Sequence, residues 1–159
     1  MPFTIRPGRA TDGAAVVELI RGLAEYEKLP GPDDAAAARF LEHAFGPQPR
    51  FGLLVAEVEG RVRGYALFFE TYSTFRAASS LFLEDLFVHP EARRHGIGRT
   101  LMLELARIAV ARGCERFEWT VLDWNESAQR FYRALGAQML GEWLVCRVEG
   151  EALVELAKT

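Results

Sequence analysis

Residues 81–100 read LFLEDLFVHPEARRHGIGRT and carry three local signals in direct succession. The apolar run from Leu81 to Val88 is typical of a central strand, and His89-Pro90 ends it. Gly96 and Gly98 then precede a helical pattern, whose apolar face consists of Ile97, Leu101, Leu105 and Ile108. A strand, a glycine loop and a helix are therefore expected to follow one another in this part of the chain.

Further strands and helices are expected on both sides of this stretch. On the N-terminal side, the apolar periodicity predicts an edge strand over residues 2–6, helices over 12–28 and from Asp33-Asp34 to Gly46, and hairpin strands over 53–58 and 62–69. On the C-terminal side, it predicts a strand over 117–122, a helix over 126–135, a strand over 138–148 and a short amphipathic tail. Residues 71–80 are polar and aromatic, which is typical of an exposed loop. The order of elements favours a mixed α/β (α+β) fold with partly parallel pairing, built as one domain over residues 1–159.

The composition excludes several classes of protein. A chain of 159 residues, of which 50% are hydrophobic, can bury a large core without metal or disulfide support. With 2 cysteines it is no disulfide-rich secreted scaffold, and a formal net charge of -3 argues against a nonspecific nucleic-acid binder. No apolar run is long enough to span a bilayer, and the N-terminus has no targeting layout. We therefore expect a soluble, cytoplasmic protein with no nucleic-acid or membrane partner.

The loop Arg93-x-x-Gly96-x-Gly98 is the first candidate for chemistry. Glycines let a ligand approach the backbone closely, and free N–H groups at the start of a helix attract phosphate. The alternative is a flexible turn that needs two glycines, and the spacing alone favours that alternative. The loop matches neither a Walker motif nor a complete dinucleotide-binding fingerprint.

The pair Glu84-Asp85 interrupts the apolar run and is the second candidate. Burial would raise the pKa of a carboxyl group there and make it a competent proton acceptor. The two-residue period of a strand places the two side chains on opposite faces, so one of them should face a cleft. A structural carboxylate that accepts hydrogen bonds from loop amides is an equally good interpretation.

Two helical positions are weaker candidates. Tyr132 lies on the inner stripe of the helix over residues 126–135, where a tyrosine is usually part of the core. Glu27 continues the buried stripe of the first long helix and, with Tyr26, could frame a pocket for a cationic ligand. A solvent-exposed last helical turn is the narrowly favoured interpretation of Glu27. The three histidines have no metal-ligand spacing, so no metal is expected.

Taken in this order, these residues resemble the Gcn5-related N-acetyltransferase (GNAT) superfamily over essentially the whole chain. Residues 93–98 match its acetyl-CoA motif, Arg/Gln-x-x-Gly-x-Gly/Ala. The resemblance is closest to the diamine acetyltransferase branch, which comprises spermidine/spermine and thialysine acetyltransferases. The stretches that carry it are residues 5–7, 23–29, 72–75, 83–88, 121–125 and 131–137. The resemblance implies a single GNAT domain with a central, twisted, mixed sheet of six to seven strands flanked by helices.

The resemblance also implies an activity and a role for individual residues. Members transfer an acetyl group from acetyl-CoA directly to a primary amine in a ternary complex, and members of this branch are usually homodimers. Tyr132 would be the general acid at the cofactor sulfur, and Glu84 would polarise a water that accepts the amine proton. Cofactor contacts would come from Leu86, Phe87, Val88, Arg93, Arg94, His95, Gly96, Ile97, Gly98, Arg99 and Asn125. Substrate contacts would come from Tyr26, Glu27, Ser73, Glu84 and Asp85.

One departure from the family pattern bears on the substrate. Polyamine-specific members carry an acidic residue directly after the tyrosine that corresponds to Tyr72, whereas this chain has Ser73. A small lysine-like amine, thialysine or a short diamine is therefore expected in place of spermidine or spermine. Two alternatives stay open at this point, namely acetylation of a peptide or protein amine, and a non-catalytic acyl-CoA-binding domain.

Overall fold

The computed structural model describes residues 1–158, which form two compact units, one over residues 1–120 and one from Val121 onward. The first unit contains β1 (Phe3–Pro7), η1 (Ala10–Asp12), α1 (Gly13–Tyr26), α2 (Asp34–Phe45), β2 (Gly52–Val58), β3 (Arg61–Ser73), β4 (Ala78–Val88), η2 (Pro90–Ala92), α3 (Ile97–Ala111) and β5 (Arg116–Trp119). The second contains α4 (Glu126–Ala134) and α5 (Glu151–Lys158). No helix of residues 1–158 is both long enough and apolar enough to cross a membrane.

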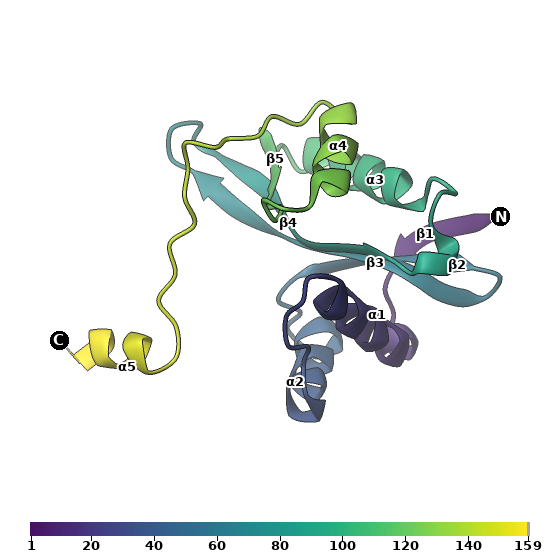
Figure 1. Ribbon diagram of the computed structural model, residues 1–159, viewed down its shortest axis with the longest axis horizontal. Coiled ribbons are helices and arrows are strands. Elements are labelled where there is room, and N and C mark those ends of the chain that lie inside the picture. The colour runs from purple at the N-terminus through teal and green to yellow at the C-terminus, as the bar shows by residue number, and fades with distance from the viewer. Residues whose placement is uncertain (159) are drawn as a thin grey trace. The chain divides into compact units, whose positions relative to one another are not determined.

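The first unit is a mixed sheet with helices on both faces. The strands lie in the order β1-β2-β3-β4-β5, and every neighbouring pair is antiparallel except β4 and β5, which are parallel. α1 and α2 lie on one face of this sheet and α3 lies on the other (Figure 1). The predicted mixed α/β fold is confirmed, with five strands in residues 1–158 in place of the six to seven expected.

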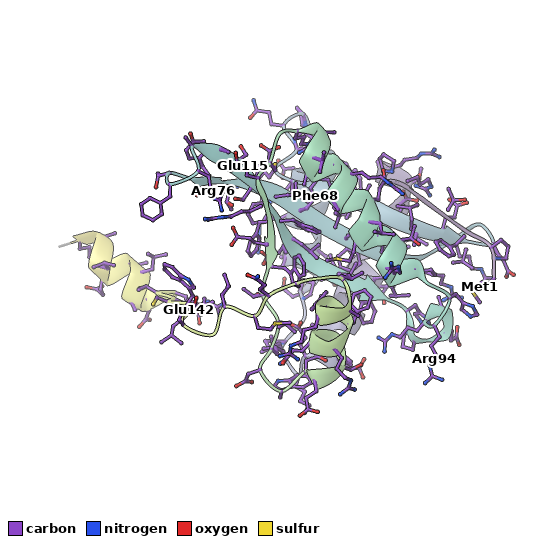
Figure 2. The ribbon with its side chains drawn as sticks, turned by 90° about the horizontal axis from the view of Figure 1, so that it is seen from above. Met1, Phe68, Arg76, Arg94, Glu115 and Glu142 are labelled. Carbon is purple, nitrogen blue, oxygen red and sulfur yellow. The ribbon has the colours of Figure 1, made fainter. Side chains whose placement is uncertain are left out.

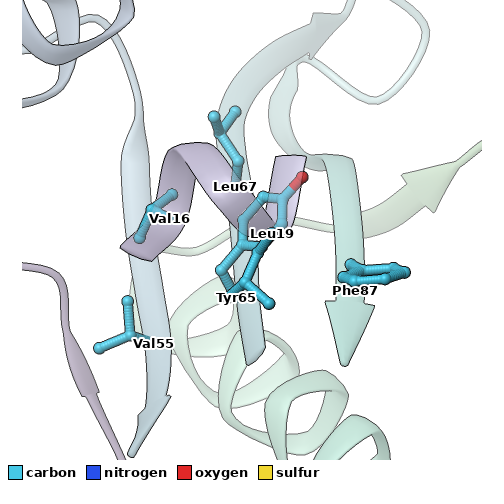
Figure 3. Close-up of a cluster of buried hydrophobic side chains, with 6 residues drawn as sticks. All are labelled: Val16, Leu19, Val55, Tyr65, Leu67 and Phe87. Carbon is cyan, nitrogen blue, oxygen red and sulfur yellow. The ribbon is translucent and has the colours of Figure 1, made fainter. Parts of the chain in front are cut away.

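The apolar run in β3 is continuous because helices cover both faces of the sheet. Tyr65 and Leu67 of this strand are buried in a cluster with Val16 and Leu19 of α1 (Figure 3). Phe68 lies on the α3 side, where the Arg112 guanidinium stands 5.5 Å from its ring centroid. The two sides of β3 thus belong to two separate apolar layers.

The predicted helices and most predicted strands are confirmed, with shifts of a few residues at their ends. Asp33 caps α2 as expected, since its carboxylate accepts a 2.8 Å hydrogen bond from the Ala36 N–H. The prediction of an exposed loop over residues 71–80 is confirmed only for the turn at residues 74–77. On both sides of this turn it is wrong, because β3 and β4 stay paired up to Ser73 and Ala78. The prediction that the strand after α3 reaches residue 122 is also wrong, since β5 ends at Trp119.

The predicted strand over residues 138–148 is wrong as well. This segment is exposed and pairs with no strand in residues 1–158. A suitable pattern of side chains does not form a strand unless a second strand supplies hydrogen bonds, and this segment lacks that partner.

A partly buried ion-pair network joins the two strands at one edge of the sheet to the start of α1. Arg6 of β1 donates to both carboxylate oxygens of Asp12, at 2.7 and 2.9 Å, and to Glu57 of β2, at 2.7 Å. The Asp12 carboxylate also accepts a 2.7 Å hydrogen bond from the Arg9 N–H. The hydrogen bonds from Arg6 are the main cause that holds the pKa of Asp12 below its ordinary value. The network therefore favours the charged form of Asp12 in the folded state.

Replacing Asp12 with asparagine should destabilise the first unit, since Asp12→Asn leaves the Arg6 guanidinium short of its main partner. We expect a loss of about 2 kcal/mol in the free energy of unfolding at neutral pH, measured by urea denaturation. Because the pKa of Asp12 is lowered on folding, its contribution is present above the ordinary aspartate pKa and fades as the pH falls below about 4. The difference between wild type and variant should narrow in that range.

The control for this variant is Glu18→Gln, which removes an exposed partner of Arg21. Such a pair is screened by solvent, so little change in stability is expected. Equal losses in the two variants would contradict the importance given to the Arg6 network.

Candidate functional site

A β-bulge at Glu84 sets the direction of the side chains that follow it in β4. In the ladder between β3 and β4, Leu83 lies opposite Phe68 and Asp85 lies opposite Leu67, so Glu84 has no partner residue. Phe68 and Leu67 are adjacent in β3, so they point to opposite faces of the sheet. Their partners Leu83 and Asp85 therefore also face opposite sides, although they are two residues apart in β4. The bulge thereby turns Asp85 onto the face that α1 covers. The bulge also interrupts the regular alternation of side chains between the two faces. The prediction that Glu84 and Asp85 point to opposite faces depends on that alternation.

Asp85 is the half-buried carboxylate of the apolar run. Its Oδ2 accepts a 3.0 Å hydrogen bond from the hydroxyl of Tyr65, a residue that is 0% exposed. Burial is the main reason why the pKa of Asp85 is raised to about 6, and the charges of Glu84 and Glu27 add to the rise, whereas the Tyr65 hydrogen bond opposes it. Asp85 is therefore mostly ionised at neutral pH and can attract a cation.

Two further carboxylates, Glu27 and Glu84, influence the ionisation of Asp85. Glu27 directly follows α1 and is half-buried, and burial raises its pKa, so the favoured expectation of a solvent-exposed side chain is wrong. The charges of Glu27 and Glu84 both raise the pKa values of Asp85 and Tyr65, which shows that they lie within electrostatic reach. We refer to Glu27, Glu84 and Asp85 as the acidic cluster. Within residues 1–158, no group of three or more His, Cys, Asp or Glu side chains is arranged to hold a metal ion.

β4 loses one of its two partner strands just before the bulge. Its parallel ladder with β5 begins where Ser80 lies opposite Arg116 and ends where Leu83 lies opposite Trp119. The ladder with β3 continues to Val88. On the side away from β3, the backbone of residues 84–88 therefore has no strand partner in residues 1–158. The predicted cofactor residues Leu86, Phe87 and Val88 lie in this open segment, whose backbone groups can pair with an extended ligand.

The glycine loop between β4 and α3 offers backbone N–H groups to a ligand. Gly96 has a φ of 83° and directly precedes α3, and nothing surrounds the position that a side chain would take there. Within residues 1–158, the backbone N–H groups of residues 94–99 donate to no protein oxygen. The loop is exposed at Arg94, His95 and Gly96 and again at Arg99, and the Arg94 side chain extends away from the body of the unit (Figure 2). Free N–H groups at the positive end of the α3 dipole are suited to binding phosphate.

Arg93, by contrast, is engaged with its own chain. Its Nε donates a 2.8 Å hydrogen bond to the carbonyl oxygen of Val88. Its guanidinium carbon lies 5.3 Å from the ring centroid of Phe87 and 5.6 Å from that of Tyr26, a distance typical of a cation–π contact. Arg93 thus joins the end of β4 to the last turn of α1, which connects the glycine loop with the region of the acidic cluster.

The second unit holds the other two predicted site residues on α4. The side-chain oxygen of Asn125 caps this helix by accepting a 3.2 Å hydrogen bond from the Ala128 N–H. Tyr132 is 9% exposed, and its ring centroid lies 5.3 Å from that of Phe131. Tyr132 is therefore held on the apolar side of α4, as the helical stripe predicts.

Ser73 is not brought to the acidic cluster within the chain. It lies at the hairpin end of β3, where its hydroxyl accepts a 3.3 Å hydrogen bond from the Arg76 N–H. Leu67 lies opposite Asp85, and the distance along the strand from Leu67 to Ser73 is about 20 Å. The hydroxyl of Ser73 therefore contributes to the turn of the hairpin.

Tyr65 is the contact that sequence reasoning missed. It lies in an apolar stretch, Gly64 to Phe69, in which its hydroxyl is the one side-chain hydrogen-bonding group. An aromatic residue in such a stretch is interpreted as core, and the position of its partner depends on the bulge in the neighbouring strand. The useful signal is the isolated hydroxyl, because a buried phenol requires a hydrogen-bond acceptor.

Comparison with known proteins identifies the family. The sequence model of the acetyltransferase (GNAT) family matches residues 15–137. The chain is 40% identical to the thialysine N-epsilon-acetyltransferase of Mus musculus, and the match covers 96% of either protein.

Solved structures share the fold. An integron cassette protein from the mobile metagenome of V. cholerae matches with a TM-score of 0.86 and 28% identity, over 100% of this chain and 99% of that one. AAC(6')-Iy, in complex with the bisubstrate analogue CoA-S-monomethyl-acetylneamine, matches with a TM-score of 0.79 and 22% identity, over 94% of this chain and 100% of that one. The sequence and fold matches together show that the chain belongs to the acetyltransferase (GNAT) family, which uses acetyl-CoA as co-substrate.

Proposed function

We propose that this protein transfers an acetyl group from acetyl-CoA to a primary amine of a small, lysine-like molecule such as thialysine or a short diamine. The observation that carries the proposal is the acidic cluster, two members of which lie on β4, the strand that leads directly into the glycine loop. Carboxylates that share one site favour a ligand with a positive charge. The 40% identity with the thialysine N-epsilon-acetyltransferase of Mus musculus supports the lysine-like class.

The proposed cofactor site uses the backbone more than side chains. The N–H groups of residues 94–99 would hold the pyrophosphate of acetyl-CoA, and the open edge of β4 from Leu86 to Val88 would pair with its amide-containing arm. The unused N–H groups and the left-handed Gly96 fit a diphosphate there. Asn125 would lie near the cofactor. Arg93 would support the loop through Val88 in place of contacting phosphate itself.

The reaction requires a neutral amine nitrogen. For an amine with a pKa near 10.4, deprotonation at pH 7 costs roughly 4–5 kcal/mol. Glu84, the unpaired residue of the bulge, would accept this proton through a water, while Asp85 and Glu27 attract the charged amine. The nitrogen then forms a bond to the thioester carbonyl carbon, the carbon–sulfur bond breaks, and Tyr132 would give the departing sulfur a proton. Tyr26 would line the amine pocket at the end of α1.

Organisation and assembly form the last part of the proposal. The two compact units would act as one domain over residues 1–159, since the family match runs from residue 15 to residue 137 across their boundary. We place the protein in the cytoplasm, in keeping with its two free cysteines.

The protein would act as a homodimer, because the segment after α4 exposes a series of large apolar side chains that a second copy could cover, namely Leu140, Trp143, Leu144, Val145 and Val148.

An amine panel tests the activity directly. Free thiol release from acetyl-CoA should be fastest with thialysine, lysine and short diamines, and slower with spermidine and with peptides. Glu84→Gln and Tyr132→Phe should each lower kcat by about a hundredfold or more while binding of acetyl-CoA by calorimetry stays nearly unchanged. Full activity in both variants would contradict these roles.

The outcome of the panel also separates the alternatives. Fastest turnover on peptides would favour a protein acetyltransferase. Binding of acetyl-CoA without turnover on any amine would favour a non-catalytic acyl-CoA-binding domain.

Gly96→Ala tests the glycine loop. Alanine at a φ of 83° is strained, so the loop should change its shape and the dissociation constant for acetyl-CoA should rise by about tenfold. Gly113→Ala is a matched control, because Gly113 has a φ of 73°, has no neighbouring atoms at the side-chain position and follows the opposite end of α3. It should lower stability to a similar degree without changing cofactor affinity. Equal affinity losses in the two variants would contradict the proposed role of the loop.

The homodimer is tested by light scattering during size-exclusion chromatography. The wild-type chain should elute with twice its monomer mass, and Leu144→Arg should shift it towards the monomer because the charge would be buried on association. Val110→Arg, at a position that is 78% exposed on α3, is the control and should stay dimeric. A monomeric wild type would contradict the proposal.

A further inference from the structure

We infer that Tyr65 is a positioning residue of the amine site, which acts by holding the Asp85 carboxylate through its hydroxyl group. The inference rests on the proposed function, in which the amine binds at the acidic cluster. Tyr65 is 0% exposed, so it would not touch the amine itself. Its role would be to fix the direction and the charge of the carboxylate that does.

The hydroxyl of Tyr65 is not needed for packing. The ring is completely buried among Val16, Leu19 and Phe87, and a phenylalanine ring would fill the same space (Figure 3). The same strand uses phenylalanine at positions 68 and 69. A buried phenol is favourable only with a hydrogen-bond partner, and here that partner is Asp85 Oδ2 at 3.0 Å. The hydroxyl is therefore best explained by what it does to Asp85.

The hydrogen bond leaves one oxygen of Asp85 available. Oδ2 accepts from Tyr65, whereas Oδ1 accepts no hydrogen bond within residues 1–158. No completely buried side-chain oxygen or nitrogen of the described chain lacks a partner, so Oδ1 is not completely buried. A carboxylate held by one oxygen presents the other in a fixed direction, as the binding of an ammonium group requires.

The charges around Asp85 explain why the contact also affects its ionisation. Glu84 lies on the same strand, Glu27 lies at the end of α1, and both favour the protonated form of Asp85. Tyr65, from β3, favours the charged form. Arg93, the cation that follows β4, is engaged with Val88 and with the rings of Tyr26 and Phe87. Tyr65 is thus the neighbour that keeps Asp85 charged near neutral pH.

Tyr65→Phe tests the inference by removing one oxygen atom. The titration of Asp85 can be followed by NMR of carbon-13-labelled aspartate, with Asp85→Asn used to assign the signal. In Tyr65→Phe its midpoint should move to higher pH by about one unit, which is the shift expected for the loss of one hydrogen bond to a charged group. The acidic limb of the kcat/KM profile for the amine should move with it. Relative to wild type, the variant should then lose about fivefold in kcat/KM near pH 6 and little above pH 8, while the KM for acetyl-CoA stays unchanged.

Two controls separate positioning from general destabilisation. Val55→Ala removes packing from the same apolar cluster, so it should lower stability and leave both pH midpoints in place. Combining Tyr65→Phe with Asp85→Asn should cost no more than Asp85→Asn alone, since Tyr65 acts through Asp85. Additive losses, or an unmoved Asp85 titration in Tyr65→Phe, would overturn the inference. A wild-type chain that acetylates no amine would instead contradict the proposed function, and the titration would then decide the inference by itself.

Discussion

One irregularity in hydrogen bonding governs the site. β4 keeps its pairing with β3 as far as Val88 but loses β5 after Leu83, and the extra residue Glu84 enters at the same place. The missing partner leaves backbone groups open for an extended ligand. The extra residue turns Asp85 towards α1, where Glu27 and the Tyr65 hydroxyl act on it. The proposed cofactor edge and two of the three carboxylates proposed to bind the amine thus lie in one short segment of β4.

The arrangement of Arg93 clarifies how the anionic end of the cofactor would be held. Its guanidinium is engaged by Val88 and two aromatic rings, so it braces the loop from within. In the proposed site, recognition of the diphosphate would then depend on peptide N–H groups whose direction is set by Gly96 and by the start of α3. Side chains at positions 94, 95 and 99 are exposed and can tune affinity without setting the geometry.

Local patterns in the sequence predict much of this molecule, and the exceptions share a cause. Helical stripes, the Asp33 cap and the glycine loop depend on residues that are close in sequence, so they can be recognised there. The face of Asp85 depends on a bulge, which a two-residue period does not reveal, and the partner of Tyr65 depends on that bulge in turn. The segment over residues 138–148 has the composition of a strand but lacks a neighbour to pair with. Long-range pairing therefore sets the limit of what periodicity can predict.

The bulge also limits how this protein can diverge. Deleting a single codon at Glu84 would make the ladder regular, because Leu83 and Asp85 would become neighbours that still lie opposite Phe68 and Leu67. The later positions of β4 would then keep their faces, and only the unpaired acid would be lost. Loss of the bulge would therefore keep the architecture of the sheet and remove Glu84, the proposed proton acceptor. A relative that shares the sheet but lacks the extra residue should therefore draw its proton acceptor from another position.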